Sequence, residues 1–434
     1  MTMTSKTNFV VFVYPERATD AIPAGRLTLV EHHAALLQST FGYGKQYVQR
    51  RDLLALDPLT LALPGPGESV LREPPITANG QLIEFGVFRD AAPDHWGRKL
   101  IENKLHRTGP LPESIYLAHA GSNRTGALDF RDTPNALVKT NELAQLLDLG
   151  YLKEAAEKVE AGEQIPARLE KIFEAGPTMG GARPKAVVEA NQHQWLAKFP
   201  LRSDTFSVPH VEYATLSLAR EAGLDVPAIR LEDIGENRPV LLIERFDRVR
   251  IGNDYSRRHF LSALTMLARH EADSPHTHYA DIAEAIATHG AASTIRQDQA
   301  ELFGRMIFNI LVHNNDDHLR NHGFIWDANL QGWRLSPLYD VVPMPAFSQE
   351  RSLHLGVGLE GRLATLPNAM SRHGVFGLTR PQAIAIINRI ANTVREWKNT
   401  FEASGVPSSD IDRLASAIRH PREVGIQEIK MGNG

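Results

Sequence analysis

Two aspartates and one asparagine between residues 309 and 340 have the types and the spacing that phosphoryl transfer requires. Asp316 is followed five residues later by Asn321, and Asp340 comes after an intervening apolar segment. In phosphoryl-transfer centres with this order, the first aspartate accepts the proton of the attacking hydroxyl, while the asparagine and the last aspartate hold Mg²⁺. Their oxygen atoms are hard ligands that suit Mg²⁺. The alternative is a solvated loop, in which such side chains hydrogen-bond to their own backbone.

Apolar residues on both sides of this loop predict the elements that position it. After the loop, residues 324–326 predict a strand, and Trp333 with Leu335 predicts its partner. We expect the loop to have a function, because dense polar groups between buried elements need a reason. Before the loop, apolar residues at helical spacing predict a buried helix: Leu302, Phe303, Met306, Ile307, Ile310 and Leu311.

The same loop supports a second hypothesis, a metal-dependent phosphohydrolase. His313, Asp317 and His318 form, together with His322, a cluster in which a transition metal would activate water. His318 and His322 are four residues apart, which is a metal-ligand spacing on a helix. Gly323 and the preceding asparagines favour a loop instead. Zinc or manganese bound tightly without nucleotide would favour the hydrolase.

A loop with two glycines precedes a predicted strand in residues 176–189, GPTMGGARPKAVVE. Gly180 and Gly181 are adjacent, and the basic residues Arg183 and Lys185 follow them. The backbone amides of such a loop can approach phosphate oxygens closely. Because the glycines are adjacent, the loop matches neither the Walker pattern nor G-x-G-x-x-G. A hairpin turn with solvated basic residues is the alternative.

Lys198 lies in the apolar run QWLAKFP, where a buried lysine needs an anionic partner. Fourteen residues later, Glu212 opens the predicted helix VEYATLSLAREAGLDVP. Kinases pair a strand lysine with a helix glutamate to hold the α- and β-phosphates. The alternative is a surface pair worth under about 1 kcal/mol. Residues 239–248, PVLLIERFDR, predict a buried strand that reaches Glu244, where the hinge of a two-lobed kinase would meet adenine.

Composition and charge exclude several classes of protein. The 434 residues favour two or three domains, and 42% hydrophobic with 23% charged residues is typical of a globular protein. A net charge of −4 gives no overall attraction to nucleic acid or anionic membranes, which disfavours a bare DNA-coating role. The lack of cysteine excludes disulfides and thiolate metal sites. With no signal peptide and no run of about 18 apolar residues, we expect a soluble cytoplasmic protein without a membrane partner.

Patterning along the rest of the chain predicts mixed α and β structure. Three β-rich runs in residues 8–64, FVVFVY, GRLTLVE and YGKQYVQR, predict a small antiparallel sheet. Residues 90–107 predict one helix, with Pro93 in its first turn. Residues 141–175 predict two amphipathic helices. An apolar stripe near the C-terminus predicts a helix whose N-cap is Thr379.

Together these segments resemble the HipA family of serine/threonine kinases, the toxins of bacterial toxin–antitoxin pairs. The resemblance spans nearly the whole chain and rests on TMGGARPK, WLAKFP, VEYATLSLAREAGLDVP, LIERFDR, NNDDHLRNHGF and LSPLYDVVP. It implies an α+β, two-lobed, protein-kinase-like fold with a small β-rich N-terminal subdomain and a mostly helical C-terminal lobe. The implied parts are a β-rich subdomain with following helices at 1–130, an ATP-binding region at 131–245, and a helical lobe with the catalytic loop at 246–434.

The resemblance also implies roles for individual residues. Asp316 is the implied catalytic base, and Asn321 and Asp340 are the implied Mg²⁺ ligands. Thr178 lies where many members carry a serine that the enzyme itself phosphorylates. The implied ATP-binding residues are Gly180, Gly181, Ala182, Arg183, Lys185, Lys198, Glu244, Phe246, His318, Asn321 and Asp340.

Three positions differ from the family pattern. Thr178 can accept phosphate but is bulkier than serine and β-branched. Asp317 stands beside Asp316, where the family usually has a small residue, so the spacing to Asn321 assigns the base. Arg320 replaces the usual lysine. A guanidinium screens phosphate charge and cannot deprotonate, so we expect its role to survive in an altered geometry.

The resemblance implies an ATP- and Mg²⁺-dependent toxin kinase that phosphorylates itself and a protein of the translation machinery, such as an aminoacyl-tRNA synthetase. The implied partner is a HipB-like helix-turn-helix antitoxin, through which the complex meets operator DNA. A small-molecule kinase is an alternative, because those enzymes use the same D-x4-N…D order. A third hypothesis is a binding partner without kinase activity. Such a protein would be expected to lack at least one of the predicted catalytic and ATP-binding residues, and all four are present: Lys198, Asp316, Asn321 and Asp340.

Overall fold

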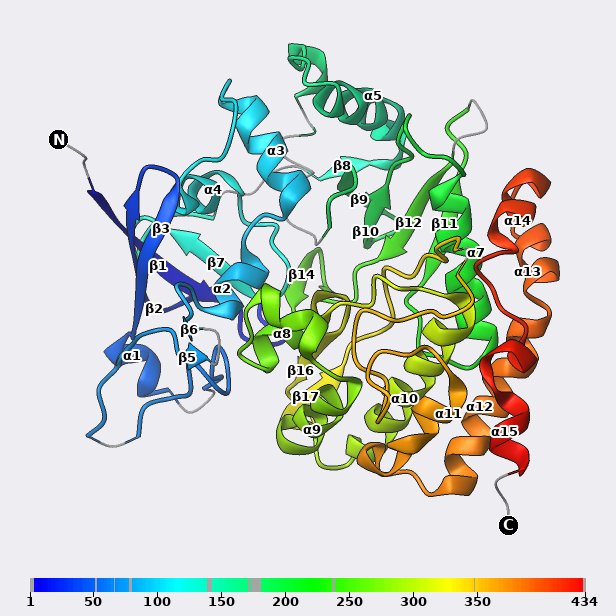
Figure 1. Ribbon diagram of the computed structural model, residues 1–434. Coiled ribbons are helices and arrows are strands. Elements are labelled where there is room, and N and C mark those ends of the chain that lie inside the picture. Colours follow the sequence, from blue (N-terminus) through cyan, green and yellow to red (C-terminus); the bar gives the residue numbers. More distant parts are fainter. Residues whose placement is uncertain are drawn as a thin grey trace. The chain divides into compact units, whose positions relative to one another are not determined.

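The computed structural model describes residues 4–50, 53–65, 67–77, 80–138, 143–170, 172, 181–235, 239–346 and 348–431. Contacts between Cα atoms divide the chain into two compact units. The first unit comprises Met1–Arg202 and Leu242–His270, and the second comprises Ser203–Leu241 and Glu271–Gly434. These boundaries differ from those of the three implied parts, and the three-part division stays a prediction. Strands are most frequent in the first unit and helices in the second (Figure 1).

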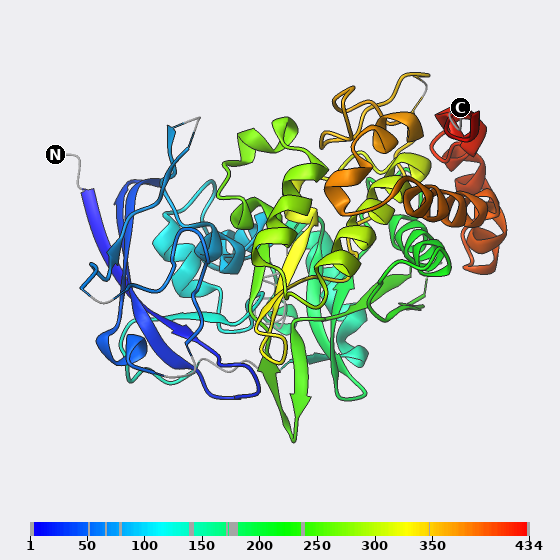
Figure 2. The ribbon, with the colours of Figure 1, turned by 90° about the horizontal axis from the view of Figure 1, so that it is seen from below.

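The first unit begins with an antiparallel sheet in the order β4-β3-β2-β1-β7. In β2, leucines 27 and 29 are buried while Arg26 and Thr28 face outward, because successive side chains of a strand point to opposite faces. Figure 2 shows the three long strands, β1 to β3, side by side. The bounds are β1 (Thr4–Val13), β2 (Ile22–His32), β3 (Ala35–Tyr43), β4 (Leu71–Arg72) and β7 (Leu128–Arg131).

The predicted third strand of this sheet was misplaced. The strand β3 ends at Tyr43, and the run YGKQYVQR instead forms the helical turn α1 (Lys45–Val48) after Gly44. Tyr47 is buried, stacks on Tyr43 with ring centroids 5.8 Å apart, and donates a hydrogen bond to Leu54 O at 2.7 Å. Packing and hydrogen bonding of one buried aromatic side chain therefore outweigh the β propensity of the run.

The predicted helix over residues 90–107 is two helices. They are α2 (Gly86–Ala91) and α3 (His95–Lys104), separated by Ala92 in an extended conformation. A residue before proline avoids the helical region, so Pro93 ends the first helix. Asp94 then caps the second, because its side chain accepts a hydrogen bond from Gly97 N at 2.7 Å.

A second sheet carries the two strands predicted around Lys198. Its order in the first unit is β12-β10-β9-β8, with β9 and β10 antiparallel and β8 parallel to β9. Asn191 and Gln192 connect β9 to β10 with positive φ angles of 50° and 63°, which suits a tight two-residue hairpin. The bounds are β8 (Ala144–Gln145), β9 (Lys185–Ala190), β10 (His193–Lys198) and β12 (Val240–Glu244), the last reaching across the unit boundary.

The remaining elements of the first unit are short. The β13–β14 hairpin protrudes as a two-stranded ribbon in Figure 2. Of the two predicted helices in residues 141–175, one is present as α5, and the end of the other lies outside the described residues. The bounds are β5 (Ile76–Thr77), β6 (Gly80–Gln81), α4 (Glu113–His119), η1 (Leu146–Asp148), α5 (Leu149–Glu160), η2 (Ala167–Leu169), β13 (Arg248–Ile251), β14 (Asp254–Arg257), β15 (Phe260–Ser262) and α8 (Ala263–Met266).

Helix α10 (Ile295–Val312) is the central element of the second unit. It is buried at most positions around its circumference and packs against α9 (Tyr279–His289) and α12 (Arg380–Arg395). This confirms the buried helix predicted before the polar loop. No helix in the described ranges, α10 included, is long and apolar enough to cross a membrane.

The other predicted elements of the second unit are also present. The strands β16 and β17 form the hairpin expected after the loop, and Thr379 begins α12 with a capping box to Gln382. The remaining bounds are α7 (Val208–Glu221), β11 (Ile229–Glu232), η3 (Glu271–His276), η4 (Leu319–Asn321), β16 (Gly323–Asp327), β17 (Gly332–Leu335), α11 (Leu366–Ser371), η5 (His373–Phe376), α13 (Trp397–Ala403), α14 (Ser408–Leu414), η6 (Pro421–Val424) and α15 (Ile426–Met431).

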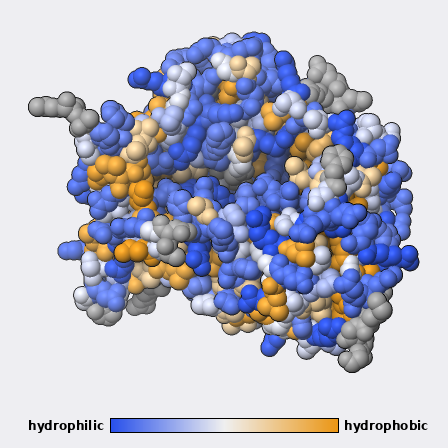
Figure 3. Space-filling view, viewed as in Figure 1, coloured by the Kyte–Doolittle hydropathy of each residue, from blue (hydrophilic) through white to orange (hydrophobic). Residues whose placement is uncertain are grey.

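One edge of the N-terminal sheet is partly open. Strand β4 pairs with Phe41 and Gly42 of β3, and the described residues place no other strand along that edge. Figure 3 shows apolar side chains gathered over β1 to β3. Leu37 of β3 is an apolar side chain that is 53% exposed.

A buried network of charges joins the loop before β7 to the chain that follows β12. Asp247 is 1% exposed, and its Oδ2 accepts hydrogen bonds from Arg245 Nη2 at 2.9 Å and Arg248 Nη1 at 2.8 Å. Gly126 N donates to the same oxygen at 2.8 Å. Burial alone would raise the pKa of Asp247, but the charges of Arg245 and Arg248 hold that pKa well below its usual value.

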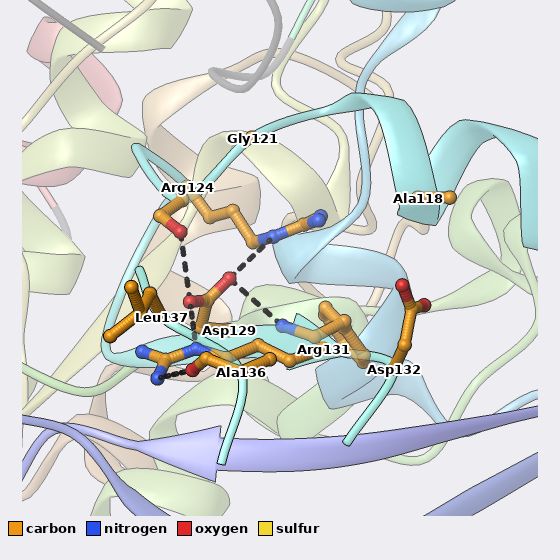
Figure 4. A pocket seen from close by; sticks show the side chains of 10 residues that line it. Ala118, Gly121, Arg124, Asp129, Arg131, Asp132, Ala136 and Leu137 are labelled. Atoms are coloured by element: carbon orange, nitrogen blue, oxygen red, sulfur yellow. Dashed lines mark hydrogen bonds and ion pairs between the residues drawn. The ribbon is translucent and has the colours of Figure 1, made fainter. Parts of the chain in front are cut away.

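Arg124 connects this network to a small pocket. Arg245 Nη2 donates to Arg124 O at 2.9 Å. In the pocket, Arg124, Asp129 and Arg131 point toward one another, whereas Asp132 points away (Figure 4). Arg131 Nε donates to Asp129 Oδ2 at 3.0 Å. The pocket contains none of the predicted site residues, so we interpret it as part of the packing of the first unit.

We expect Asp247→Asn to destabilise the first unit. The substitution leaves two buried guanidinium groups without their counter-charge, which lowers the free energy of unfolding by roughly 3–5 kcal/mol. Urea unfolding of the two proteins measures the difference. Asp132→Asn, which changes an exposed carboxylate nearby, is the control and should stay within about 0.5 kcal/mol of the wild type. Equal effects of the two substitutions would contradict a structural role for Asp247.

Candidate active site

The loop that carries Asp316 begins where α10 ends, at His313. His313 has a left-handed backbone conformation with φ of 53°, which stops the helix. Its ring Nδ1 lies 2.6 Å from Met344 O, and Met344 N donates back to His313 O at 3.1 Å. These two contacts fasten the start of the loop to the segment that follows Asp340. The end of α10 therefore determines where the loop begins.

Asn321 folds this loop back on itself. Its side-chain Nδ2 donates a hydrogen bond to Asp316 O at 2.7 Å, and the residue is 8% exposed at the end of η4. Because the amide nitrogen is used in this bond, the orientation of the side chain is fixed. The Oδ1 atom, which accepts and cannot donate, is the part of Asn321 that suits a cation.

Asp340 lies close to Asp316 within the second unit. Partial desolvation, together with the negative charge of Asp340, raises the pKa of the Asp316 carboxyl, while His318 opposes the rise. Asp340 has a left-handed φ of 59°, which is uncommon for a residue other than glycine. The preceding Tyr339 donates from its hydroxyl to Arg320 O at 2.8 Å. The structure thus brings Asn321 into contact with Asp316 and places Asp340 near enough for its charge to act on the Asp316 carboxyl.

The two neighbouring aspartates have opposite environments. The Asp316 side chain is 70% exposed, whereas Asp317 is 1% exposed. Asp317 Oδ2 accepts a hydrogen bond from the Tyr279 hydroxyl at 2.7 Å, and its Oδ1 accepts one from His354 N at 2.7 Å. An acceptor of protons from a substrate must be reachable, so the geometry favours Asp316 over Asp317 for that role.

Two buried asparagine side chains extend the hydrogen-bond network of Asp317 through the Tyr279 hydroxyl. Asn309 Nδ2 donates to the Tyr279 hydroxyl at 2.9 Å, and Asn314 Nδ2 donates to Asn309 Oδ1 at 3.2 Å. Both asparagines and Tyr279 are buried. The sequence patterns did not indicate a role for these three residues. An Asn in the middle of an apolar helix was the one available signal, because such a residue needs a buried partner.

The histidines of the loop do not form the metal cluster of the hydrolase hypothesis. In the described part of the chain, no three His, Asp or Glu side chains lie close enough together to hold a metal ion. His322 is 1% exposed and packs edge-on against the Tyr279 ring at 5.3 Å between centroids. Asp317 is occupied by Tyr279 and His354, as described above. His318 has its Nε2 3.8 Å from Asp316 Oδ1, which places it beside the predicted base.

The predicted phosphate-binding residues are in the first unit. Lys198 ends β10 and is 7% exposed, opposite Lys185 of β9 in the strand register. Gly181 and Ala182 are exposed, and Arg183 is half-buried. Thr178 and Gly180 lie outside the described residues. Lys185 is 2% exposed and forms an ion pair with Asp94, Nζ to Oδ2 2.7 Å, which the sequence did not indicate.

Glu244 ends β12, which confirms the predicted strand, and Phe246 follows two residues later. Their role as an adenine-binding hinge stays a prediction. Both are half-buried, and Glu244 Oε1 lies 2.6 Å from His193 Nδ1. The Phe246 ring is 6.2 Å from that of Phe260. Glu212 lies on α7 in the second unit and is 2% exposed. Its pairing with Lys198 stays a prediction.

A family model for the HipA-like C-terminal domain matches residues 178–397, just over half of the 434-residue chain. The protein named "Putative kinase Y4dM" of Sinorhizobium fredii is 27% identical over 228 residues, covering 50% of this chain and 53% of that protein. The protein named "Putative kinase" of Haemophilus influenzae is 31% identical over 146 residues, covering 32% of this chain and 42% of that protein. The matches therefore span about half or less of each relative.

Among solved structures, this chain is similar to one from the complex of HipA, HipB and operator DNA of the Shewanella oneidensis MR-1 toxin–antitoxin system. The TM-score is 0.66 at 16% identity, with 98% of this chain and 100% of that chain covered. At this identity the similarity shows the fold alone. It confirms the predicted mixed α and β, kinase-like fold with a β-rich N-terminal region.

Asp317→Asn should change how stability depends on pH. Burial raises the pKa of Asp317 to about 6 from 3.8, so between these pH values the folded protein retains a proton that the unfolded chain releases. This contribution to stability is present at low pH and is lost as pH rises through about 6. Relative to the variant, the wild-type melting temperature should therefore fall by a few degrees between about pH 4 and about pH 7.

The control for this measurement is Asp412→Asn, a change to an exposed carboxylate on α14. Its melting temperature should run parallel to that of the wild type across the pH series. A difference between wild type and Asp317→Asn that does not vary with pH would contradict the raised pKa.

Proposed function

Since the chain belongs to the HipA-like family, we propose that it is an ATP- and Mg²⁺-dependent kinase that phosphorylates serine or threonine hydroxyls of proteins. The names of its curated relatives suggest kinase activity in general. The observation that carries the proposal is the gathering of Asp316, Asn321 and Asp340 in the second unit, with Asp316 accessible and its pKa sensitive to the charge of Asp340. Such a set of oxygen atoms beside an exposed carboxylate suits phosphoryl transfer.

Asp316 would act as the base. Its exposed carboxylate accepts a hydrogen bond from the hydroxyl of the acceptor residue, orients that hydroxyl, and takes its proton as the oxygen attacks phosphorus. The hydrogen bond from Asn321 to Asp316 O fixes the backbone that carries this carboxylate. Most of the rate acceleration would come from positioning and electrostatic stabilisation, because phosphoryl transfer needs little covalent help from the protein.

Asn321 and Asp340 are the residues that would hold Mg²⁺. The fit rests on their chemistry, because an amide oxygen of fixed orientation and a carboxylate are both hard oxygen ligands. When bound with ATP, the ion neutralises charge on the phosphates. In the first unit, Lys198 would contact the α- and β-phosphates, Gly181 to Arg183 would cover the triphosphate, and Glu244 with Phe246 would flank adenine.

The partners and targets are also part of the proposal. The complex of the Shewanella oneidensis MR-1 protein contains HipB and operator DNA. By analogy, we propose that a small helix-turn-helix antitoxin neutralises this kinase and links it to operator DNA. A protein of the translation machinery would be its substrate in the cytoplasm. Thr178 would be the site at which the chain phosphorylates itself.

Asp316→Asn should abolish most phosphate transfer while preserving nucleotide binding. The amide keeps the size of the side chain but loses the basicity of the carboxylate, so the rate should fall by about 10²- to 10⁴-fold. Transfer from labelled ATP to lysate proteins measures the rate, and phosphoamino acid analysis identifies the acceptor. The affinity for MgATP should change by no more than a few-fold. Unchanged transfer would refute the assignment of the base, and Asp412→Asn provides the control.

Asn321 offers a test of the metal ligands. Asn321→Ala removes the oxygen ligand and should raise the Mg²⁺ concentration for half-maximal transfer by about tenfold or more. Asn321→Asp retains an oxygen at this position but loses the hydrogen bond to Asp316 O. We therefore expect a smaller rise in the Mg²⁺ requirement for the Asp variant. The same requirement in both variants would indicate that Asn321 acts only through the loop.

A further inference from the structure

The side chain of Lys185 is paired with the residue that caps helix α3. Its Nζ lies 2.7 Å from Asp94 Oδ2, and both residues are buried. Asp94 is also the N-cap of α3, through its bond from Gly97 N at 2.7 Å. One carboxylate thus serves two partners, the helix start and a lysine 91 residues further along the chain. A buried ammonium is unfavourable without such an anion.

The main chain at Lys185 is held from the same helix. The indole Nε1 of Trp96 donates to Lys185 O at 2.8 Å, and Trp96 is fully buried. On the other side, Phe199 N donates to Pro184 O at 3.0 Å. Lys185, the first residue of β9, is therefore held by Asp94 at its side chain and by Trp96 at its carbonyl oxygen. The carbonyl of the preceding Pro184 is held by Phe199, which follows β10.

Gly181, the first described residue of the glycine loop, lies close to the same ammonium group. Its φ of 120° is a conformation that residues other than glycine rarely adopt. A Cβ atom built at Gly181 would lie 2.9 Å from Lys185 Nζ, so the absence of a side chain permits this approach. The ammonium of Lys185 thus lies between the described end of the glycine loop and Asp94.

We propose that Asp94 and Trp96 are positioning residues for the nucleotide, because they hold the glycine loop in place through Lys185. This inference rests on the proposed kinase function. It makes Lys185 a structural tether, whereas the family resemblance implied that Lys185 contacts ATP. Side chains of α3 therefore influence nucleotide affinity without touching the nucleotide. Preorganisation of this kind reduces the ordering that binding requires.

The sign of one affinity change separates the two roles of Lys185. Asparagine is also a good N-cap, so Asp94→Asn preserves the start of α3 while removing the charge that holds the lysine. If Lys185 is a tether, the loop loosens and the Kd for MgATP rises by about tenfold or more. If Lys185 is instead a phosphate ligand that Asp94 restrains, the same substitution releases it and the Kd falls or stays unchanged, which would overturn the inference.

Amide hydrogen exchange of peptides covering residues 181–190 supplies a readout that needs no nucleotide. The tether predicts faster exchange in Asp94→Asn than in the wild type, and unchanged exchange would refute it. Glu113→Gln is the matched control, because Glu113 pairs with Arg98 of α3 at 2.7 Å, so the substitution removes another ion pair of the same helix and leaves Asp94, Trp96 and Lys185 in place. Both its exchange and its Kd should match the wild type.

A second variant covers the case in which Asp94→Asn does not fold. Trp96→Phe keeps an aromatic ring but removes the hydrogen bond to Lys185 O, so exchange should again be faster and the Kd higher. Wild-type values for this variant would overturn the role of α3. If the wild-type chain binds no MgATP, the proposed function fails, and the exchange data still decide whether α3 holds the loop.

Discussion

The buried carboxylate of Asp317 determines how the candidate active site is arranged. A carboxylate that is removed from water requires donors, and here they come from Tyr279 on α9 and from the backbone at His354. Asn309 of α10 in turn donates to the tyrosine hydroxyl. One buried charge therefore joins α9, α10 and the chain near residue 354 around the loop. The position of Asp316 follows from this anchoring of its neighbour.

The first unit applies the same rule with a buried ion pair and with a backbone hydrogen bond to a buried carboxylate. Asp94 and Lys185 are 91 residues apart in the chain, and Gly126 and Asp247 are separated by 121. Each contact joins segments that no local pattern relates. Buried ion pairs contribute little net stability compared with apolar packing, but loss of one partner is strongly unfavourable. Such pairs therefore specify which segments lie together, and in this unit they connect the N-terminal region to the strands that carry the predicted nucleotide-binding residues.

The sequence predicted those elements whose residues repeat at a regular period or carry a strong local signal. The apolar spacing around Met306, the apolar runs in β9 and β10, and the cap at Thr379 were sufficient for α10, the two strands and α12. The misplaced third strand and the divided helix at Pro93 depended on packing and on a single backbone restriction. The residue types of the candidate site were visible, but the partners of Lys185 and Asp317 were not, because partners distant in sequence leave no periodic trace.

Asp316 and Asp317 show why residue type alone does not assign a role. They are identical and adjacent, yet one is 70% exposed and the other 1% exposed. With a pKa of about 6, Asp317 is mostly ionised at neutral pH, and its charge is compensated by inward-facing donors. Partial burial raises the pKa of Asp316 and the charge of Asp340 adds to the rise, so a cation bound beside these carboxylates would lower that pKa and favour the ionised form. The buried Asp317 therefore positions the loop, and the exposed Asp316 remains accessible to a substrate.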